Sequence, residues 1–324
     1  MEEFETNENE DEPNDLRDVQ PTSFKHVIGQ QHVVDALMIA VEASFNQRKR
    51  LDEVLLIGPP GLGKTALVSV VASELAVPFT EVLAQSVTNT AELNNLLMSS
   101  AEGILFLDEI HLLSPVQQHS LLQVLDKRRI FLSGGKCVTS VPVSDFTLVG
   151  ATTDPDGLIQ PLLDRFRMVL HLDYYSEDEL AEVVRQRCKA LGWDHEAELL
   201  NEIAQRGRGT PRIALRLLQS ANRVCSSENC DTITVKHLTR ACEIERISGL
   251  GLDHVQQKYL RLLNNGPVRL NVLSSMLGLS TKAITKTIEP FLLRSEMVVK
   301  SDGGQRQLSE AGRDHLTEMC AVRV

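Results

Sequence analysis

The chain has 324 residues, of which 42% are hydrophobic, and its formal net charge is −11 at pH 7. A chain of this length can bury the cores of about two or three domains. Its apolar runs are far shorter than the roughly 20 residues of a membrane-spanning helix, and its acidic N-terminus is unlike a signal peptide. We therefore expect a cytoplasmic protein that makes no membrane contact.

The charge is unevenly distributed along the chain. Residues 1–20 contain nine acidic residues and one arginine, a net charge of −8, so the other 304 residues sum to only −3. Residues 250–324 carry ten lysine and arginine residues against seven acidic ones, a net charge of +3. The first segment has too little apolar content to fold, which predicts a disordered acidic tail over residues 1–20. The remainder is charge-segregated, with its basic end at the C-terminus.

The six cysteines are scattered, with no C-x-x-C pair and no matching histidine cluster. This spacing predicts ordinary reduced thiols. It indicates neither a disulfide scaffold nor a zinc site.

Strands and helices alternate through the first half of the chain. After an amphipathic helical segment at 27–47, apolar runs predict strands at 54–57, 77–84, 103–109 and 145–153, with helices from 66 onward and at 91–98 and 115–125. This alternation predicts an α/β domain over residues 21–175, in which helices cover both faces of a parallel sheet.

The segment between the first strand and its helix, "GPPGLGKT" at 58–65, fits the phosphate-binding pattern G-x-x-x-x-G-K-[ST] at every fixed position. Gly61 and Gly63 let backbone N–H groups curl around an anion, toward which the next helix points its positive N-terminus. Lys64 can reach the outer phosphates, and Thr65 can ligate Mg²⁺. The alternative is a plain Gly/Pro-rich turn, but the strand-turn-helix context is the one that the motif requires.

The strand in "ILFLDEIH" at 104–111 delivers two carboxylates to the carboxyl end of the sheet. Asp108 can hold Mg²⁺ through water, and Glu109 can orient or polarise an attacking water. The alternative for two adjacent carboxylates is a solvated strand end. Together with the phosphate-binding loop, they predict nucleotide hydrolysis.

The second half of the chain first becomes helical and then basic. From 176 to about 247 the pattern is helical throughout, beginning with a capping box of Ser176 and Glu179, which predicts a small all-α domain at 176–250. Three short amphipathic helices and two strand-like runs around a Gly-Gly turn follow, which predicts a winged-helix domain at 251–324. Its helix at 280–294, with Lys282 and Lys286 near its start, is the candidate recognition helix for DNA. A protein-contact domain is the alternative.

Several segments carry a resemblance to a known family. "LFLDEIH" after "GPPGLGKT" is similar to the AAA+ superfamily of ring-forming ATPases. The chain further resembles the RuvB family over about 24–316, in "VIGQ" at 27–30, "TLVGATTDP" at 147–155, "LLDRFRMVLHLDYYS" at 162–176 and "RGRGTPRIALRLL" at 206–218. The resemblance implies an AAA+ P-loop domain, a lid and a winged helix. It also implies an ATP- and Mg²⁺-dependent DNA helicase that drives branch migration of Holliday junctions in recombination and repair, as a hexameric ring on duplex or four-way-junction DNA.

The resemblance also implies residue roles. Thr152 matches the polar sensor of the γ-phosphate, and Arg165 matches the arginine finger donated to the neighbouring subunit's ATP. Arg212 matches the second sensor arginine, which reports the nucleotide state to the lid. An arginine given in trans would make hydrolysis depend on the neighbour. The implied nucleotide contacts are Ile28, Gly61, Gly63, Lys64, Thr65, Ala66, Tyr175, Pro211 and Arg212, with Thr65 and Asp108 at the metal.

The sequence departs from the family in three places. The hairpin region at 128–146, which in the family grips the partner RuvA, is shorter and has a different apolar pattern. Gln20 and Leu163 each replace a family arginine. In the wing, "KSDGGQRQ" keeps Lys300 and Arg306 as candidate DNA contacts, but an acidic residue and a glycine stand where a neutral residue and an arginine are expected.

Two other functions remain open at this stage. The altered hairpin is compatible with an AAA+ ATPase that has diverged to clamp loading or protein remodelling without RuvA. A nucleotide-gated DNA-binding scaffold with little turnover is the second alternative, against which the intact Glu109 and Arg165 argue.

Overall fold

A computed structural model of the chain describes residues 20–134, 137–301 and 303–321. The chain forms two compact units, Met1–Val183 with Thr210–Arg212, and Val184–Gly209 with Ile213–Val324. The predicted disordered tail lies outside the described residues, apart from Gln20. Among the described residues, no helix has the length and apolar content needed to span a membrane. The division into three domains at 21–175, 176–250 and 251–324 stays a prediction.

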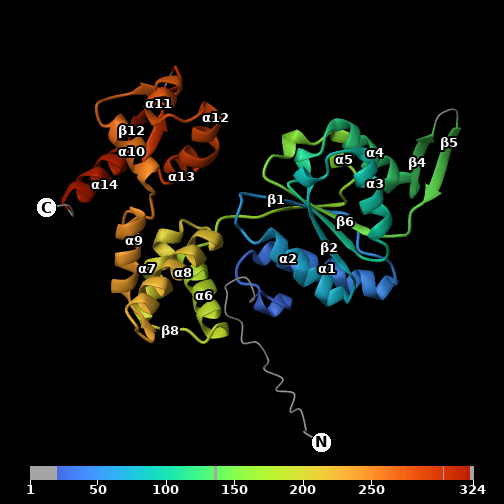
Figure 1. Cartoon of the computed structure of the whole chain (residues 1–324), viewed down its shortest axis with the longest axis horizontal. Helices are drawn as coiled ribbons and strands as arrows, with labels where there is room; N and C mark the ends of the chain where they lie inside the picture. The colour runs from blue at the N-terminus through green and yellow to red at the C-terminus, as the bar shows by residue number, and fades with distance from the viewer. Residues whose placement is uncertain (1–19, 135–136, 302, 322–324) are drawn as a thin grey trace, which may run out of the picture. The chain divides into compact units, whose positions relative to one another are not determined.

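The first unit is built on a five-stranded parallel sheet with strand order β2-β3-β6-β1-β7; β1, β2 and β6 are labelled in Figure 1. The strands are β1 (Val54–Ile57), β2 (Phe79–Leu83), β3 (Ile104–Asp108), β6 (Thr147–Thr152) and β7 (Met168–His171). The first four agree with the predicted strands. β1 lies between β6 and β7, with Ile57 opposite both Thr152 and His171. This register puts the end of β1 beside the end of β6, where the site is built.

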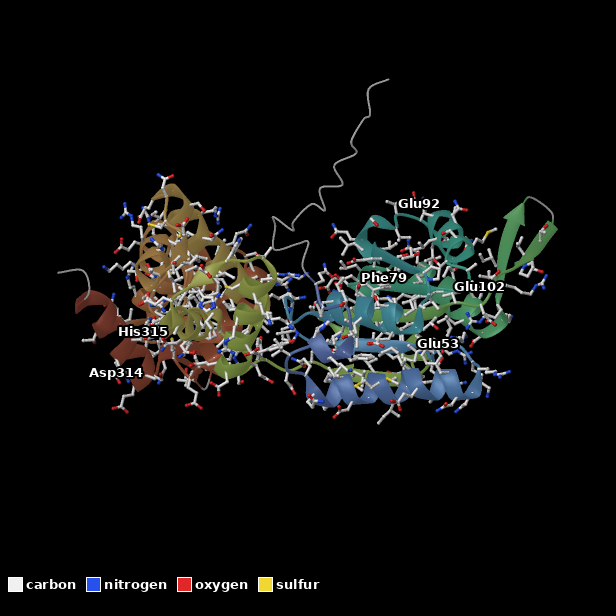
Figure 2. The ribbon with its side chains drawn as sticks, turned by 90° about the horizontal axis from the view of Figure 1, so that it is seen from below. Glu53, Phe79, Glu92, Glu102, Asp314 and His315 are labelled. Atoms are coloured by element: carbon white, nitrogen blue, oxygen red, sulfur yellow. The ribbon has the colours of Figure 1, made fainter. Side chains whose placement is uncertain are left out.

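Helices cover both faces of this sheet (Figure 1), which confirms the predicted α/β class. Alternate strand residues face opposite sides, so Leu56 and Phe106 belong to one buried cluster and Leu55 and Leu107 to the other. Phe79, labelled in Figure 2, stacks on Phe106 with ring centroids 6.1 Å apart. The first cluster includes residues of α1 (Gln31–Gln47) and α2 (Lys64–Leu75), and the second includes residues of α3 (Thr90–Ser99), α4 (Pro115–Lys127) and α5 (Gln160–Leu163).

Ion pairs stabilise the amino end of the sheet. Glu53, labelled in Figure 2, is 3% exposed and precedes β1. Its Oε1 accepts from Arg50 Nη2 at 2.7 Å and from Arg128 Nη2 at 3.3 Å. Arg128 follows α4 directly and leads into an antiparallel hairpin of β4 (Arg129–Gly134) and β5 (Cys137–Pro142). The region at 128–146 therefore still forms a hairpin.

The lid region is mainly helical, as predicted. Its helices are α6 (Glu177–Ala190), α7 (Ala197–Gly207), α8 (Pro211–Ser227) and α9 (Val235–Glu245). The predicted capping box is confirmed, because Ser176 N–H donates to Glu179 Oε2 at 2.8 Å and Glu179 N–H donates to Ser176 Oγ at 3.2 Å. The prediction that this region is helical throughout is wrong in one detail. The loops before α7 and α9 run side by side and pair as two short parallel strands, β8 (Asp194–His195) and β9 (Thr232–Ile233).

The C-terminal region has the helices and wing of a winged helix. Its elements are α10 (His254–Leu263), β10 (Val268–Arg269), α11 (Leu270–Leu277), α12 (Thr281–Ala283), α13 (Glu289–Arg294), β11 (Val298–Lys300), β12 (Gln305–Leu308) and α14 (Glu310–Ala321). The predicted wing hairpin is confirmed by antiparallel pairing of β11 with β12. Its turn contains Gly303 and Gly304 with φ of 85° and 75°, a conformation that glycine adopts without strain. The sequence analysis did not identify β10, which adds a third strand.

The predicted recognition helix is interrupted. Between α12 and α13 the backbone is π-helical over Ile284–Ile288. Pro290 lacks an N–H group, and its ring would clash with the carbonyl four residues earlier in a regular helix. The wider π turn accommodates this ring while Ile284 and Ile288 remain buried in the domain core.

A buried ion-pair network joins this helical segment to the wing. Glu289 is 1% exposed and accepts from Arg306 Nε at 2.7 Å and Nη2 at 3.2 Å, while Tyr259 Oη donates to it at 2.9 Å. Arg306 Nη1 donates to the Gly304 carbonyl at 2.6 Å. Burial by itself would raise the pKa of Glu289, but the hydrogen bonds from Arg306 and Tyr259 outweigh burial and lower it.

The prediction that Arg306 contacts DNA does not agree with this placement. The residue is 8% exposed and its guanidinium donors are used within the domain. Arg306 stabilises the wing from inside the domain. Its ion pair with Glu289 links the wing strand β12 to α13 and so holds the hairpin against the domain core.

We predict that Arg306→Ala destabilises the second unit by about 3–5 kcal/mol, because it leaves Glu289 buried without its charge partner. The measurement is urea unfolding of the full chain. Lys300→Ala is the matched control: its Nζ lies 3.9 Å from Glu289 Oε2, but its side chain is 51% exposed, so its loss should cost less than about 1 kcal/mol.

Lowering the pH should reduce the difference in the free energy of unfolding between wild type and Arg306→Ala. Since the folded pKa of Glu289 is lowered, its contribution is complete above the ordinary glutamate pKa and is lost as the pH falls through the folded value. Equal losses of unfolding free energy for Arg306→Ala and Lys300→Ala at neutral pH would contradict the assignment of this ion-pair network.

Candidate nucleotide-binding site

The loop between β1 and α2 is folded as an anion cradle. Gly61 and Gly63 have φ of 84° and 92°, and Gly63 directly precedes the first turn of α2. The Gly58 N–H donates to the Thr152 carbonyl at 3.1 Å, and Leu62 is fully buried beneath the loop. The N–H groups at the helix start are therefore held together at the carboxyl edge of the sheet, where an anion can accept from them.

Lys64 lies inside this loop and is 7% exposed. Its ammonium donates to the Gly58 carbonyl at 2.8 Å and to the Pro59 carbonyl at 3.0 Å. Burial lowers the pKa of Lys64, while the nearby Glu109 and Asp108 charges oppose the shift. The cation is thus held at the loop by neutral carbonyls, which a phosphate oxygen could replace as the stronger partner.

Asp108 and Glu109 leave β3 at the same edge of the sheet. Glu109 has φ of 51°, and its N–H donates to Asp108 Oδ1 at 3.0 Å, so the turn directs the two side chains differently. Burial raises the pKa of Asp108, and the charge of Glu109 adds to the shift. Nearby positive charges and hydrogen bonds therefore compensate the negative charge of Asp108 only in part, and a cation beside it would be favoured.

Glu109 is held by residues that follow β6. Its Oε2 accepts from Thr153 Oγ1 at 3.0 Å and from Thr153 N–H at 3.3 Å. His111 Nδ1 lies 3.3 Å from the same oxygen and 2.9 Å from Thr152 Oγ1. Because a carboxylate can only accept, a proton on Nδ1 suits this arrangement best. Thr152, which is fully buried, is thereby connected to Glu109 through one imidazole.

The structure adds site residues that the sequence analysis missed. His111 stood inside the quoted "ILFLDEIH" but was assigned no role, and Thr153 follows the predicted sensor directly. Glu81 comes from the neighbouring strand β2, where the Thr65 hydroxyl donates to it. Burial, and then the charge of Asp108, raise the pKa of Glu81. No local motif marks Glu81, because only strand pairing brings β2 next to β3.

The predicted adenine-side residues also approach the loop. The Tyr175 hydroxyl donates to the Leu62 carbonyl at 3.3 Å, and burial raises the pKa of Tyr175 to about 12. A Cβ atom at Gly29 would lie 2.8 Å from the Tyr175 ring, which puts Ile28 and its neighbour beside this tyrosine. Ile28 itself is half-buried.

Arg212 reaches the loop from the start of α8. Its backbone N–H donates to the Gly61 carbonyl at 3.3 Å, and its charge acts on both Lys64 and Asp108. Pro211 occupies the first position of α8, where its missing N–H is not needed. Arg212 is therefore near the place where phosphates would lie.

Arg165 lies apart from this constellation within the single chain. Its Nη2 donates to the Leu125 carbonyl at 3.3 Å and lies 3.2 Å from Asp126 Oδ1. Both partners are on α4, and the Arg165 side chain is 40% exposed. An arginine finger would have to act on a neighbouring molecule from this position.

Taken together, the residues fit a nucleoside triphosphate with Mg²⁺. Glycine N–H groups and Lys64 match phosphate oxygens, and the Thr65 hydroxyl with Asp108 supplies the hard oxygen ligands that Mg²⁺ prefers. Burial is the main cause of the raised pKa of Asp108 and of Glu81, and the charge of a neighbouring carboxylate adds to each shift, so a cation at this edge would stabilise both carboxylates. Glu109 and Thr152 lie at the same sheet edge, where a water could be held.

Three of the four predicted DNA contacts are on the surface. Lys282 and Lys286 are exposed and lie one helical turn apart, on α12 and the π-helical segment. Lys300 is exposed at the end of β11. Arg306 is the exception described above.

Comparisons with known proteins agree with this architecture. The chain matches the family models for the Holliday junction DNA helicase RuvB P-loop domain over 19–172, the RuvB AAA lid domain over 175–248 and the RuvB C-terminal winged helix domain over 249–317. The chain belongs to the RuvB family. The predicted resemblance is therefore confirmed, as is the combination of an AAA+ P-loop domain, a lid and a winged helix.

Similar full-length proteins support the assignment to the RuvB family. The Holliday junction branch migration complex subunit RuvB of Synechococcus sp. (strain CC9311) is 36% identical, over 92% of this chain and 86% of that protein. The protein of that name from Tropheryma whipplei (strain TW08/27) is 35% identical, over 92% and 89%. A solved structure of the Thermotoga maritima RuvB Holliday junction branch migration motor superposes with a TM-score of 0.79 at 32% identity, over 92% of this chain and 98% of that one.

We predict that Gly61→Ala destabilises the nucleotide-free protein more than Gly63→Ala does. Both substitutions put alanine at positive φ, which costs on the order of 1–3 kcal/mol. At Gly61 the new Cβ would also lie 2.9 Å from Arg212 Cβ, whereas at Gly63 the nearest atom, Tyr175 Oη, is 3.9 Å away. Thermal unfolding of the two variants gives the comparison. Equal losses would mean that the start of α8 does not lie against the loop.

Proposed function

We propose that this chain is an ATP-driven DNA motor that moves the branch point of four-way junctions, and that it works in recombination and repair as a subunit of a ring. The proposal is supported by the presence of a phosphate-binding loop, two adjacent carboxylates and a winged helix in one chain, which matches RuvB family models over most of its length. Both the DNA and the ATP that such a motor needs are found in the cytoplasm.

The chemistry follows from the placement of the side chains. Lys64 leaves the Gly58 and Pro59 carbonyls to bind the outer phosphates, and the α2 N-terminus binds their oxygens through N–H groups. Asp108 and Thr65 would hold Mg²⁺, which when bound would neutralise phosphate charge. Glu109 accepts a proton of the attacking water and orients it, and Thr152 contacts the γ-phosphate.

Arg165 completes the site of the next subunit. Within its own chain it bonds to α4, and its half-exposed guanidinium can exchange Asp126 for the phosphates of a neighbour. Guanidinium suits the charge that develops on a transferred phosphoryl group. Hydrolysis then requires a neighbour, which favours a closed ring, and the RuvB resemblance makes that ring a hexamer. Arg212 reports the bound nucleotide to the lid.

DNA contact falls to the exposed lysines of the winged helix. Lys282 and Lys286 contact phosphates from the recognition segment and Lys300 does so from the wing. Arg306 and Glu289 support this surface from inside the domain. A RuvA-like protein is the proposed partner for the β4–β5 hairpin, which the chain retains.

We predict that steady-state ATP hydrolysis by the full chain is stimulated by a synthetic four-way junction and by linear duplex, and that the stimulation fades as salt rises. Glu109→Gln should bind ATP without turnover. DNA binding by lysine variants should be measured as well. Each of Lys282→Ala and Lys286→Ala should lower the slope of log binding constant against log salt concentration by about one unit, whereas the control Lys49→Ala, in the first unit, should leave it unchanged.

The alternatives give different results in this assay. Hydrolysis that no DNA changes would indicate a clamp-loading or protein-remodelling ATPase that works without RuvA. Absence of hydrolysis in every condition would indicate a nucleotide-gated scaffold. Either result would overturn the proposed motor.

A second prediction concerns the trans role of Arg165. Arg165→Ala alone and Lys64→Ala alone should each be inactive, because one lacks the finger and the other lacks the phosphate ligand. Mixtures of the two should regain activity, since some interfaces then combine an intact loop with an intact arginine. The control mixture is Lys64→Ala with Glu109→Gln, in which every subunit has a defect in its own loop site, so no interface is intact and turnover should stay absent. If no mixing ratio restored turnover, the finger assignment would be wrong.

A further inference from the structure

A group of metal-ligand side chains meets in the lid, far along the chain from the nucleotide-binding residues. It consists of Glu228, Cys230 and His237, whose ligand atoms all lie within 4.8 Å of one another. Glu228 and Cys230 follow the end of α8, and His237 is in the first turn of α9. The sequence analysis predicted no zinc site, because these residues have no C-x-x-C spacing and β9 separates Cys230 from His237 in the chain.

The turn after α8 explains how its two ligands come together. Glu228 N–H donates to the carbonyls of Val224 and Cys225, and Cys230 N–H returns to the Cys225 carbonyl at 3.1 Å. Asn229 between them has φ of 54°, which reverses the chain. The carbonyls at a helix C-terminus carry partial negative charge. A cation held at this turn is therefore favoured by the end of α8 as well as by its ligands.

His237 provides the rigid side of the group. Its ring is 6% exposed, and its Nδ1 accepts from the Thr234 N–H at 3.0 Å, as part of the cap of α9. This contact leaves Nε2 aimed at Glu228 Oε2, 3.4 Å away. Glu228 and Cys230 are exposed, so they can adjust to a ligand without disturbing the lid core. The described cysteines Cys188, Cys225, Cys230 and Cys242 are free thiols.

We propose that Glu228, Cys230 and His237 bind a transition-metal cation, best suited to Zn²⁺, with water in the fourth position. A thiolate, an imidazole and a carboxylate form a borderline-soft ligand set that Zn²⁺ accepts and that Mg²⁺ and Ca²⁺ do not favour. Tetrahedral bonds of about 2.0–2.3 Å put ligand atoms roughly 3–4 Å apart, so small side-chain rotations of the two exposed residues close the site.

Protons balance in this binding step. Cys230 releases its proton to solvent, and the ionised Glu228 needs no change. The His237 proton moves from Nε2 to Nδ1. The Thr234 N–H then gives up its hydrogen bond to Nδ1, and a small rotation of the ring lets Thr234 Oγ1, now 3.2 Å away, accept the Nδ1 proton. One proton is released for each cation, and the two anionic ligands neutralise its charge.

A bound cation would link the end of α8 to the start of α9 through its three ligands. Because a cation bound only by the folded lid stabilises it by mass action, unfolding should move to higher temperature with Zn²⁺. The proposal does not depend on the proposed function, since it concerns a different part of the chain.

The experiment titrates the full chain with Co²⁺ in excess Mg²⁺, which occupies the hard-oxygen site at the nucleotide loop. Wild type should show a thiolate-to-cobalt absorption band that saturates at one equivalent and disappears when Zn²⁺ is added. Cys230→Ser should lose the band. Glu228→Gln should bind Co²⁺ at least about tenfold more weakly.

The matched control is Glu243→Gln, also an exposed glutamate in the lid and 3.3 Å from Arg240, which should bind Co²⁺ as wild type does. Nitrogen NMR of His237 gives a second readout, because Zn²⁺ should shift the ring to its Nδ1–H form. Absence of the band in wild type, its persistence in Cys230→Ser, or equal affinities of Glu228→Gln and Glu243→Gln would each overturn the proposal.

Discussion

The register of one strand pair determines the candidate site. β1 pairs with β6 so that Ile57 lies opposite Thr152, and the Gly58 N–H continues this pairing onto the Thr152 carbonyl. The phosphate-binding loop therefore starts beside the candidate sensor. β3 lies on the other side of β6 and ends at Asp108 on the same edge. Because the strands are parallel, their carboxyl ends meet, and polar residues distant in the sequence are brought within hydrogen-bonding distance.

Lys64 and Glu109, two of the charged groups at this edge, have partners within the protein. Lys64 bonds to loop carbonyls, and Glu109 bonds to Thr153 and lies beside His111. These contacts limit the cost of keeping a cation and two carboxylates half-buried at one edge. A phosphate and a metal ion would offer stronger partners to the same groups. His111 connects Glu109 to Thr152, since its Nδ1 lies close to both side chains.

The second unit places its charges by a different principle. In the winged helix, Glu289 and Arg306 are both buried and satisfy one another, so the wing is fixed from within. Lys282, Lys286 and Lys300 remain on the surface. In the lid, His237 is buried while Glu228 and Cys230 are exposed. In both places a buried polar residue is held by hydrogen bonds beside exposed charged or polar groups.

The sequence by itself determined the features that depend on neighbouring residues. The strand at Val54–Ile57, the loop at 58–65, the capping box of Ser176 and Glu179 and the Gly-Gly turn of the wing agree with the structure, because each depends on local backbone preferences or on periodicity. The RuvB resemblance also led to Tyr175 and Arg212, which lie at the loop. Only the tertiary structure decided the rest. Glu81 joins Thr65 through strand order, Arg306 turns inward to Glu289, and Cys230 meets His237 across a chain reversal. Such contacts are set by how buried charge is compensated across elements, a property of the packed chain that no local pattern encodes.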